Sequence, residues 1–138
     1  MKQLQAALSK PEGYLEIFKR IEKARWVEPG VVHIQMTMPF LFQSRDYISA
    51  FQLTKQPNEW LLSFSPAQNQ RIPPAPEVVR LDDYRGVWSL KPKDSHRVSV
   101  SFFWNSDYNL PTSIWSRDRV RRQQGEEIMT QLKAYCNQ

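Results

Sequence analysis

The sequence predicts an α+β fold in which a curved antiparallel sheet packs against one long C-terminal helix. Three observations support this prediction. Within residues 19–105, apolar and polar side chains alternate in short segments that turns separate, as in strands with one apolar face. A short helical pattern precedes these segments, and a longer one follows them. At 138 residues the chain fits one domain, so we expect a single unit over 1–138.

The first predicted element is a helix over Met1–Ser9. Leucine and alanine recur there at helical spacing, and Pro11–Gly13 then interrupts the pattern. The stretch that follows is ambiguous between helix and strand. A turn at Glu28–Gly30 favours a hairpin whose two strands are Lys19–Val27 and Val31–Met38.

The later strands show the same alternation. Their predicted ranges are Asp46–Lys55, Glu59–Ser65, Val78–Leu81, Tyr84–Leu90 and Arg97–Asn105. A short turn joins the first two of these, so a second hairpin follows the first and the sheet begins as a meander. Pro66–Pro76 holds four prolines among polar residues, which predicts a surface loop at the rim of the sheet.

The C-terminal helix is predicted to begin near Thr112, after a break at Asp107–Leu110. Its apolar face consists of Ile128, Met129, Leu132, Tyr135 and Cys136. Traced towards the start of the helix, this face passes Gln124, Arg121 and Arg117. The middle of the predicted inner face is therefore unexpectedly polar.

Charge limits the classes of partner. The chain has 19 Lys and Arg residues against 14 Asp and Glu residues, a net charge of +5. Much of the excess lies in Arg117, Arg119, Arg121 and Arg122. Because Glu126 and Glu127 follow at once, we expect a solvated helix face, with contact to anionic lipid head groups as the alternative. No recognised motif accompanies the charge, so nucleic acid is not an expected partner.

The single cysteine and the lack of long apolar runs limit which cellular compartments are expected. Cys136 is the single cysteine, which excludes an intrachain disulfide. No apolar run approaches the roughly 18 residues that a membrane span needs, and the N-terminus lacks the apolar centre of a signal peptide. We therefore expect a soluble, cytoplasmic protein whose contact with membranes is at most transient.

The pattern of reactive side chains does not predict an active site. His33 lies on the polar face of its strand, and His96 lies in a turn. Neither has the companions of a metal site, and no serine or cysteine is placed with both a histidine and an acid. We expect no cofactor, no metal and no enzymatic activity.

Several segments together resemble START (StAR-related lipid transfer) domains. The stretch Thr37–Tyr47 reads T-M-P-F-L-F-Q-S-R-D-Y, and Gly86–Pro92 reads G-V-W-S-L-K-P. Val79-Arg80, Asp107 and Leu110-Pro111 occur in the family's order. The resemblance covers roughly Tyr14 to the C-terminus. It implies a helix-grip arrangement, with a tunnel between sheet and C-terminal helix, and the binding or transfer of a hydrophobic lipid-like molecule.

On this resemblance, the apolar face of the sheet and the inner face of the helix line the tunnel. The candidate ligand-binding residues are Val32, Ile34, Met36, Met38, Phe51, Leu53, Leu62, Phe64, Trp88, Phe102, Trp104, Ile114, Arg117, Arg121 and Ile128. The apolar members would equally fill a plain sheet core. For Arg117 and Arg121, three roles are open: reaching the mouth of the tunnel, contacting a partner chain, or extending into water.

The chain also departs from the family. START domains open with a helix and a first strand that have no counterpart here, so the sheet would keep an unpaired edge. We expect a second copy to cover this edge in a homo-oligomer such as a dimer; a misassigned start codon is the other explanation. Sterol-binding members carry a buried acid and arginine at positions that match Val32 and Phe51, which are apolar here. A long-chain acyl lipid is therefore favoured over a sterol.

Two rival functions stay open. One is a helix-grip enzyme of the cyclase or hydratase type acting on an apolar substrate. The other is a subunit without a cavity that serves only in assembly. Arg45-Asp46 could be a functional pair. Its position at a strand entry favours a structural role, in which the acid accepts hydrogen bonds and the arginine holds a loop.

Overall fold

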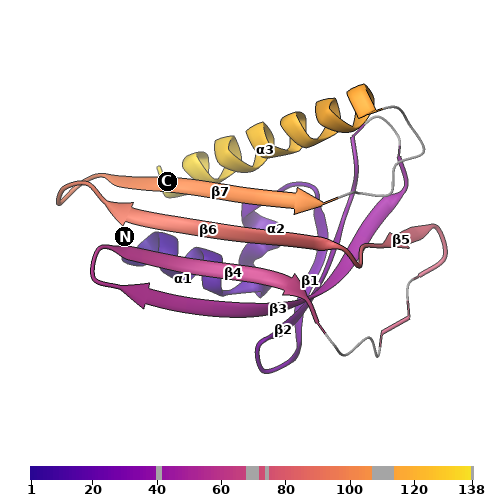
Figure 1. Ribbon diagram of the computed structural model, residues 1–138, viewed down its shortest axis with the longest axis horizontal. Helices are drawn as coiled ribbons and strands as arrows, with labels where there is room; N and C mark the ends of the chain where they lie inside the picture. The colour runs from indigo at the N-terminus through magenta and orange to yellow at the C-terminus, as the bar shows by residue number, and fades with distance from the viewer. Residues whose placement is uncertain (40–41, 68–71, 74, 107–113, 138) are drawn as a thin grey trace.

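In the computed structural model, which describes all residues except 40–41, 68–71, 74, 107–113 and 138, three helical segments and one long helix flank a single sheet (Figure 1). The helical segments at the start are α1 (Lys2–Ser9), a 3-10 turn (Pro11–Gly13) and α2 (Tyr14–Ile17). The strands are β1 (Ile21–Glu28), β2 (Val31–Met36), β3 (Ser44–Gln56), β4 (Glu59–Pro66), β5 (Val78–Arg80), β6 (Tyr84–Pro92) and β7 (Val98–Ser106). The long helix α3 spans Ile114–Cys136.

Six strands form an antiparallel path in the order β1-β2-β3-β4-β6-β7. The predicted α+β class, with its meander of hairpins and its C-terminal helix, is therefore confirmed. The short strand β5 differs from the rest because it pairs with β3 in parallel. β4 is too short to pair with the whole of β3 and begins its pairing only at Ser49. The first residues of β3, Ser44–Asp46, are therefore left for β5 to pair with. The predicted break at Asp107–Leu110 lies outside the described residues.

The sheet has one strongly aromatic face. Residues directly opposite one another in the register share a face, which places Tyr47, Phe51, Phe64, Tyr84, Trp88, Phe102 and Trp104 together. Their rings are in contact: the ring centres of Trp88 and Phe102 lie 4.3 Å apart, and those of Tyr84 and Trp104 lie 5.4 Å apart. Such contacts stabilise a sheet beyond the area that each ring buries.

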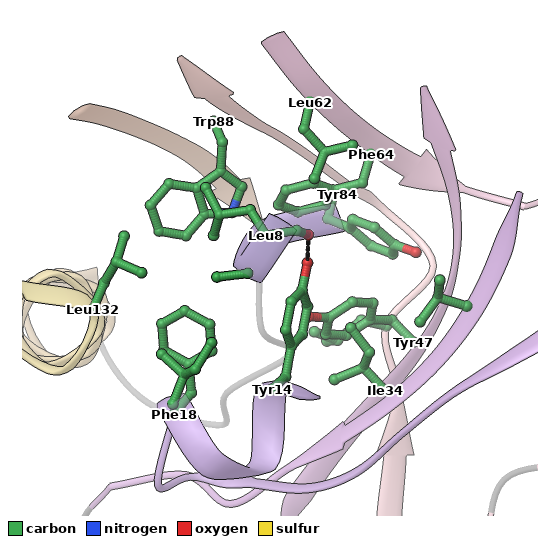
Figure 2. Packing of buried hydrophobic residues seen from close by; sticks show 14 of the residues in the cluster. Leu8, Tyr14, Phe18, Ile34, Tyr47, Leu62, Phe64, Tyr84, Trp88 and Leu132 are labelled. Carbon is green, nitrogen blue, oxygen red and sulfur yellow. Dashed lines mark hydrogen bonds between the residues drawn. The ribbon is translucent and has the colours of Figure 1, made fainter. Parts of the chain in front are cut away.

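The helical segments cover this aromatic face. Figure 2 shows Leu8 of α1 and Tyr14 of α2 beneath the sheet, and Leu132 of α3 facing Phe18 and Trp88 from one side. Leu8 is completely buried, and the Tyr14 hydroxyl donates a hydrogen bond to the Leu8 carbonyl oxygen. The N-terminal segment therefore closes one end of the concave face.

The opposite face of the sheet carries a buried ionic network around Asp46. Its carboxylate accepts hydrogen bonds from Arg80 Nε at 2.7 Å and from Arg80 Nη2 at 3.0 Å, and His33 Nε2 lies 2.9 Å from it. Burial opposes ionisation of Asp46, but the hydrogen bonds from Arg80 and His33 lower its pKa below the ordinary value. Arg45 is buried and holds the carbonyl of Gln43. The structural role expected for Arg45-Asp46 is therefore what the geometry provides.

The expectation that His33 has no acid companion was wrong. The alternation assigns it correctly to the face opposite Ile34, but that face is not exposed to solvent there: His33 is buried and has an acid partner. Arg80 of β5 packs over the same carboxylate and also donates to the carbonyl of Ile72 at 2.8 Å. A period-two pattern identifies the face of a residue but not what covers that face.

Gly86 has no side chain because Phe64 occupies the space beside it. The two residues are direct partners between β4 and β6, and a Cβ atom on Gly86 would overlap the Phe64 ring. The aromatic ring therefore lies across the glycine and keeps a fixed place on the concave face.

We predict that Gly86→Ala lowers the free energy of unfolding by about 1–3 kcal/mol, because Phe64 must move within a packed face. Chemical denaturation measures this change. Gly125→Ala is the matched control: Gly125 has open space around it in the middle of α3, and alanine there should stabilise the helix by about 1 kcal/mol. Equal effects of the two variants would contradict the role assigned to the Phe64 ring.

Candidate functional site

An apolar pocket lies between the aromatic face of the sheet and α3. Its lining residues are Tyr14, Phe18, Arg20, Ile21, Ile34, Met36, Tyr47, Phe51, Phe64, Trp88, Phe102, Trp104, Gln124, Glu127, Ile128 and Gln131. The unfilled volume is about 90 Å³. Ligand pockets usually have about 300–1,000 Å³. The pocket is thus a small opening in the core, with a wall that is almost entirely apolar on the sheet side.

The pocket contains about half of the candidate ligand-binding residues predicted from the sequence. Those that line it are Ile34, Met36, Phe51, Phe64, Trp88, Phe102, Trp104 and Ile128. Val32, Met38 and Leu62 are buried in the core but do not line it. Leu53 has the right face by register, but it lies near the far end of β3 and is 46% exposed. The side chains of Ile114 and Arg117 lie outside the described part.

The inward stripe of α3 agrees with the predicted one from Gln124 onward and differs from it before Gln124. Val120, Gln124 and Leu132 are buried, and Ile128 lies between them on the same side. The predicted stripe passed through Arg121 instead, which is exposed and lies 3.7 Å from the carboxylate of Asp118 on its own helix. A lone valine among arginines gives a weak periodic signal. The prediction therefore placed Arg121 on the inner face, where the structure has Val120.

Polar contacts fasten α3 to the segment before β1. Arg20 donates to the Glu127 carboxylate through Nε at 2.5 Å and through Nη2 at 3.0 Å. The backbone N–H of Lys19 donates to Gln131 Oε1 at 3.0 Å. The hydrogen bond from Arg20 lowers the pKa of Glu127 despite partial burial. We call these two contacts the α3 latch. No local pattern predicts the latch, because its partners lie more than a hundred residues apart.

Among the described residues of the inward stripe, Gln124 is the one side chain that is both polar and buried. It is 5% exposed and lines the pocket. Its Nε2 lies 3.3 Å from the sulfur of Met38, and its Oε1 is buried without a hydrogen-bond partner. The predicted inner face passed through Gln124, but periodicity alone did not mark it as a pocket residue.

Two tyrosines at the pocket keep their protons. Burial raises the pKa of Tyr14 far above its ordinary value. Burial also raises the pKa of Tyr84, just behind the pocket, to about 12, and its hydroxyl donates to the Ile48 carbonyl at 2.9 Å. Among the described residues, no group of three histidine, cysteine or acidic side chains is placed to hold a metal ion. The arrangement offers an apolar surface and neutral hydrogen-bonding groups.

Comparison with known proteins identifies the fold. No protein-family model and no curated protein matches this sequence. Among solved structures, the crystal structure of human STARD10 is similar with a TM-score of 0.85 at 11% identity, over 98% of this chain and 57% of that one. A fragment of a STAR-related lipid transfer protein from Xanthomonas axonopodis is similar with a TM-score of 0.81 at 13% identity, over 99% of this chain and 79% of that one. The chain has the START fold.

The START fold agrees with the helix-grip arrangement that the sequence resemblance implied. In both comparisons almost the whole of this chain is covered, whereas it spans only 57% of the length of the STARD10 chain. Within the described residues of this START fold, no helix is long and apolar enough to cross a membrane.

We predict that Glu127→Gln loosens α3. The partly buried ion pair should contribute about 0.5–1 kcal/mol, so backbone amides in the second half of α3 should exchange hydrogen faster. Hydrogen exchange with mass spectrometry measures this. Glu126→Gln changes the same charge on an exposed neighbour and should leave the exchange unaltered.

The same latch sets a pH dependence. Because the pKa of Glu127 is lowered in the folded protein, its stabilising effect is complete above the ordinary glutamate value of about 4.3 and is lost as pH falls further. Exchange in the wild type should approach that of Glu127→Gln at low pH. Identical exchange of the two proteins at neutral pH would show that the latch contributes nothing.

Proposed function

We propose that this protein binds a hydrophobic lipid-like ligand between the sheet and α3, and that it carries this ligand within the cytoplasm rather than transforming it. The observation that supports this most strongly is the apolar pocket beneath α3, lined by Phe51, Phe64, Trp88, Phe102 and Trp104. The Xanthomonas protein of the same fold is named a lipid transfer protein, which supports a lipid as the ligand class.

The ligand enters by displacing α3. A lipid tail is larger than the unfilled volume of about 90 Å³, so the wall of the pocket must give way. The latch is the polar connection that has to open, and water can replace its hydrogen bonds at small cost because both ends are partly exposed. Burial of each methylene of a tail gains roughly 0.8 kcal/mol, so a ten-carbon tail gains about 8 kcal/mol before ordering costs.

Binding is favoured over an enzymatic role. A cyclase or hydratase would need ionisable groups free to exchange protons with a substrate. Among the described pocket residues, Arg20 and Glu127 are engaged with each other, and the raised pKa of Tyr14 keeps its phenol neutral. A role in assembly alone would leave the pocket without a use.

We predict that Phe51→Arg weakens the uptake of an apolar ligand at least about tenfold, because a charge in the pocket must stay hydrated. Displacement of a neutral fluorescent alkyl analogue measures the affinity, and circular dichroism checks the fold. Leu53→Arg is the matched control, since Leu53 lies two residues away on the same strand but is exposed. Unaltered uptake in Phe51→Arg would contradict the assignment of the pocket as the binding site.

The proposal includes a dimer that forms along β7. In the described residues no strand pairs with the outer edge of β7. Its sequence, Val98–Ser106, has no charge and no proline, and its register with β6 runs without a bulge. Phe103 is 59% exposed on it. The other edge strand, β1, carries exposed Glu22, Lys23 and Arg25 and two register shifts, which protect an edge against pairing.

A second copy is the partner that this edge fits. Two β7 strands can pair antiparallel about a two-fold axis, and an uncharged strand meets no like-charge repulsion from its copy even though the chain carries +5. The pairing would satisfy the free backbone groups of both copies. It would also join the two sheets with their concave faces on the same side.

We predict that Phe103→Lys shifts the protein from dimer to monomer, because two introduced lysines would approach each other along the paired edges. Sedimentation velocity measures the change. Leu15→Lys places the same charge at another exposed apolar residue, in α2, and should leave the dimer intact. A wild type that sediments as a monomer would exclude the paired edge and leave the ligand proposal standing.

A further inference from the structure

The buried side-chain amide of Gln124 lowers the stability of the fold because its oxygen has no hydrogen-bond partner. A buried amide needs partners for both its oxygen and its nitrogen, and leaving one unpaired destabilises a protein. Here the oxygen has no partner, and the nitrogen meets only a thioether. A leucine at this position would continue the apolar stripe of Val120 and Ile128 without that cost. Packing alone therefore does not account for the glutamine.

The orientation of the amide follows from Met38. A thioether sulfur can accept a hydrogen bond but cannot donate one. The NH2 group must therefore face the Met38 sulfur, at 3.3 Å, and the carbonyl oxygen is the group left unpaired. What the pocket offers at this point is an acceptor, so it calls for a ligand group that donates.

The charges around the pocket favour a ligand that is neutral. Arg20 is the cationic side chain among the described lining residues, and its Nε and Nη2 are both engaged with the two carboxylate oxygens of Glu127. Once the ligand is bound and α3 has closed again, a carboxylate or phosphate head group would have to displace Glu127 from Arg20. It would also bring a negative charge close to the unpaired oxygen of Gln124.

From these three points we infer that the ligand is a neutral lipid with a hydroxyl or amide N–H, and that the Gln124 carbonyl oxygen accepts a hydrogen bond from this group. This inference rests on the proposed lipid-binding function and adds the chemistry of the head group. The donor reaches a buried residue, whereas the partly exposed latch lies one turn further along α3. The lipid therefore binds with its polar end against Gln124 and its chain along the aromatic face.

Two isomeric probes test the inference with the full chain. Dodecanol and undecyl methyl ether have the same atoms, but only the alcohol can donate a hydrogen bond. Each competes with a neutral fluorescent alkyl analogue for delipidated protein. The wild type should bind the alcohol about tenfold more tightly than the ether, the ratio expected for one neutral hydrogen bond in a buried site.

Variants assign the preference to Gln124. Gln124→Leu should lose the preference while binding the ether at least as tightly as the wild type does. Gln124→Met is a second variant of similar shape in case the first does not fold. Thr130→Leu, on the exposed side of α3, is the control that should keep the preference.

The outcomes separate the inference from the function on which it rests. If the wild type binds alcohol and ether equally, the pocket binds apolar chains but Gln124 accepts no hydrogen bond from the ligand. The inference is then wrong. A preference that persists in both Gln124 variants assigns recognition to another residue and also overturns it. If neither probe displaces the analogue from the wild type, the proposed lipid binding fails, and the inference fails with it.

Discussion

The structure depends on covering one concave aromatic face. The sheet brings the rings of β3, β4, β6 and β7 together on that face, and burying so many rings strongly stabilises the fold. The N-terminal helices cover one end, where Leu8 is completely buried (Figure 2). The long helix α3 covers the other end, and its apolar stripe is too interrupted by polar residues to fill the space. The pocket is the part of the face that neither group of helices fills.

The opposite face of the sheet holds its strands together through buried ionic contacts. Asp46 joins His33 of β2 and Arg80 of β5 through one buried carboxylate, so three strands are bound together on the side away from the pocket. Removing one partner of a buried ion pair costs about 3–5 kcal/mol. This is several times the value of the partly exposed latch. On the proposed function, the sheet is therefore the rigid part of the site, and α3 is the part that moves to admit the ligand.

Period-two alternation predicted strands such as β4 and β6, because every second residue there is buried on one face. The strand β1 has no buried residue and was predicted from the turn that follows it. It could not predict the parallel pairing of β5, which depends on β4 being too short to cover the start of β3. The burial of His33 depends on the same distant segment. In α3 the arginines around Val120 obscured the phase of the helix, so Arg121 was placed inside. The contacts of Arg20 and Gln124 join segments far apart in the chain, where no local pattern carries information.

The polarity of α3 links these observations to the proposed function. A helix with a continuous apolar stripe would be held on the aromatic face by several kcal/mol of buried area, and a lipid would have to compete with it. The stripe of α3 instead alternates Val120 and Ile128 with Gln124, and its latch to Arg20 is partly hydrated. Each polar position lowers the cost of lifting the helix, since water or a ligand hydroxyl can take over its hydrogen bonds. On the proposed function, the same residues that weaken the packing of α3 are those that admit the lipid and recognise its polar end.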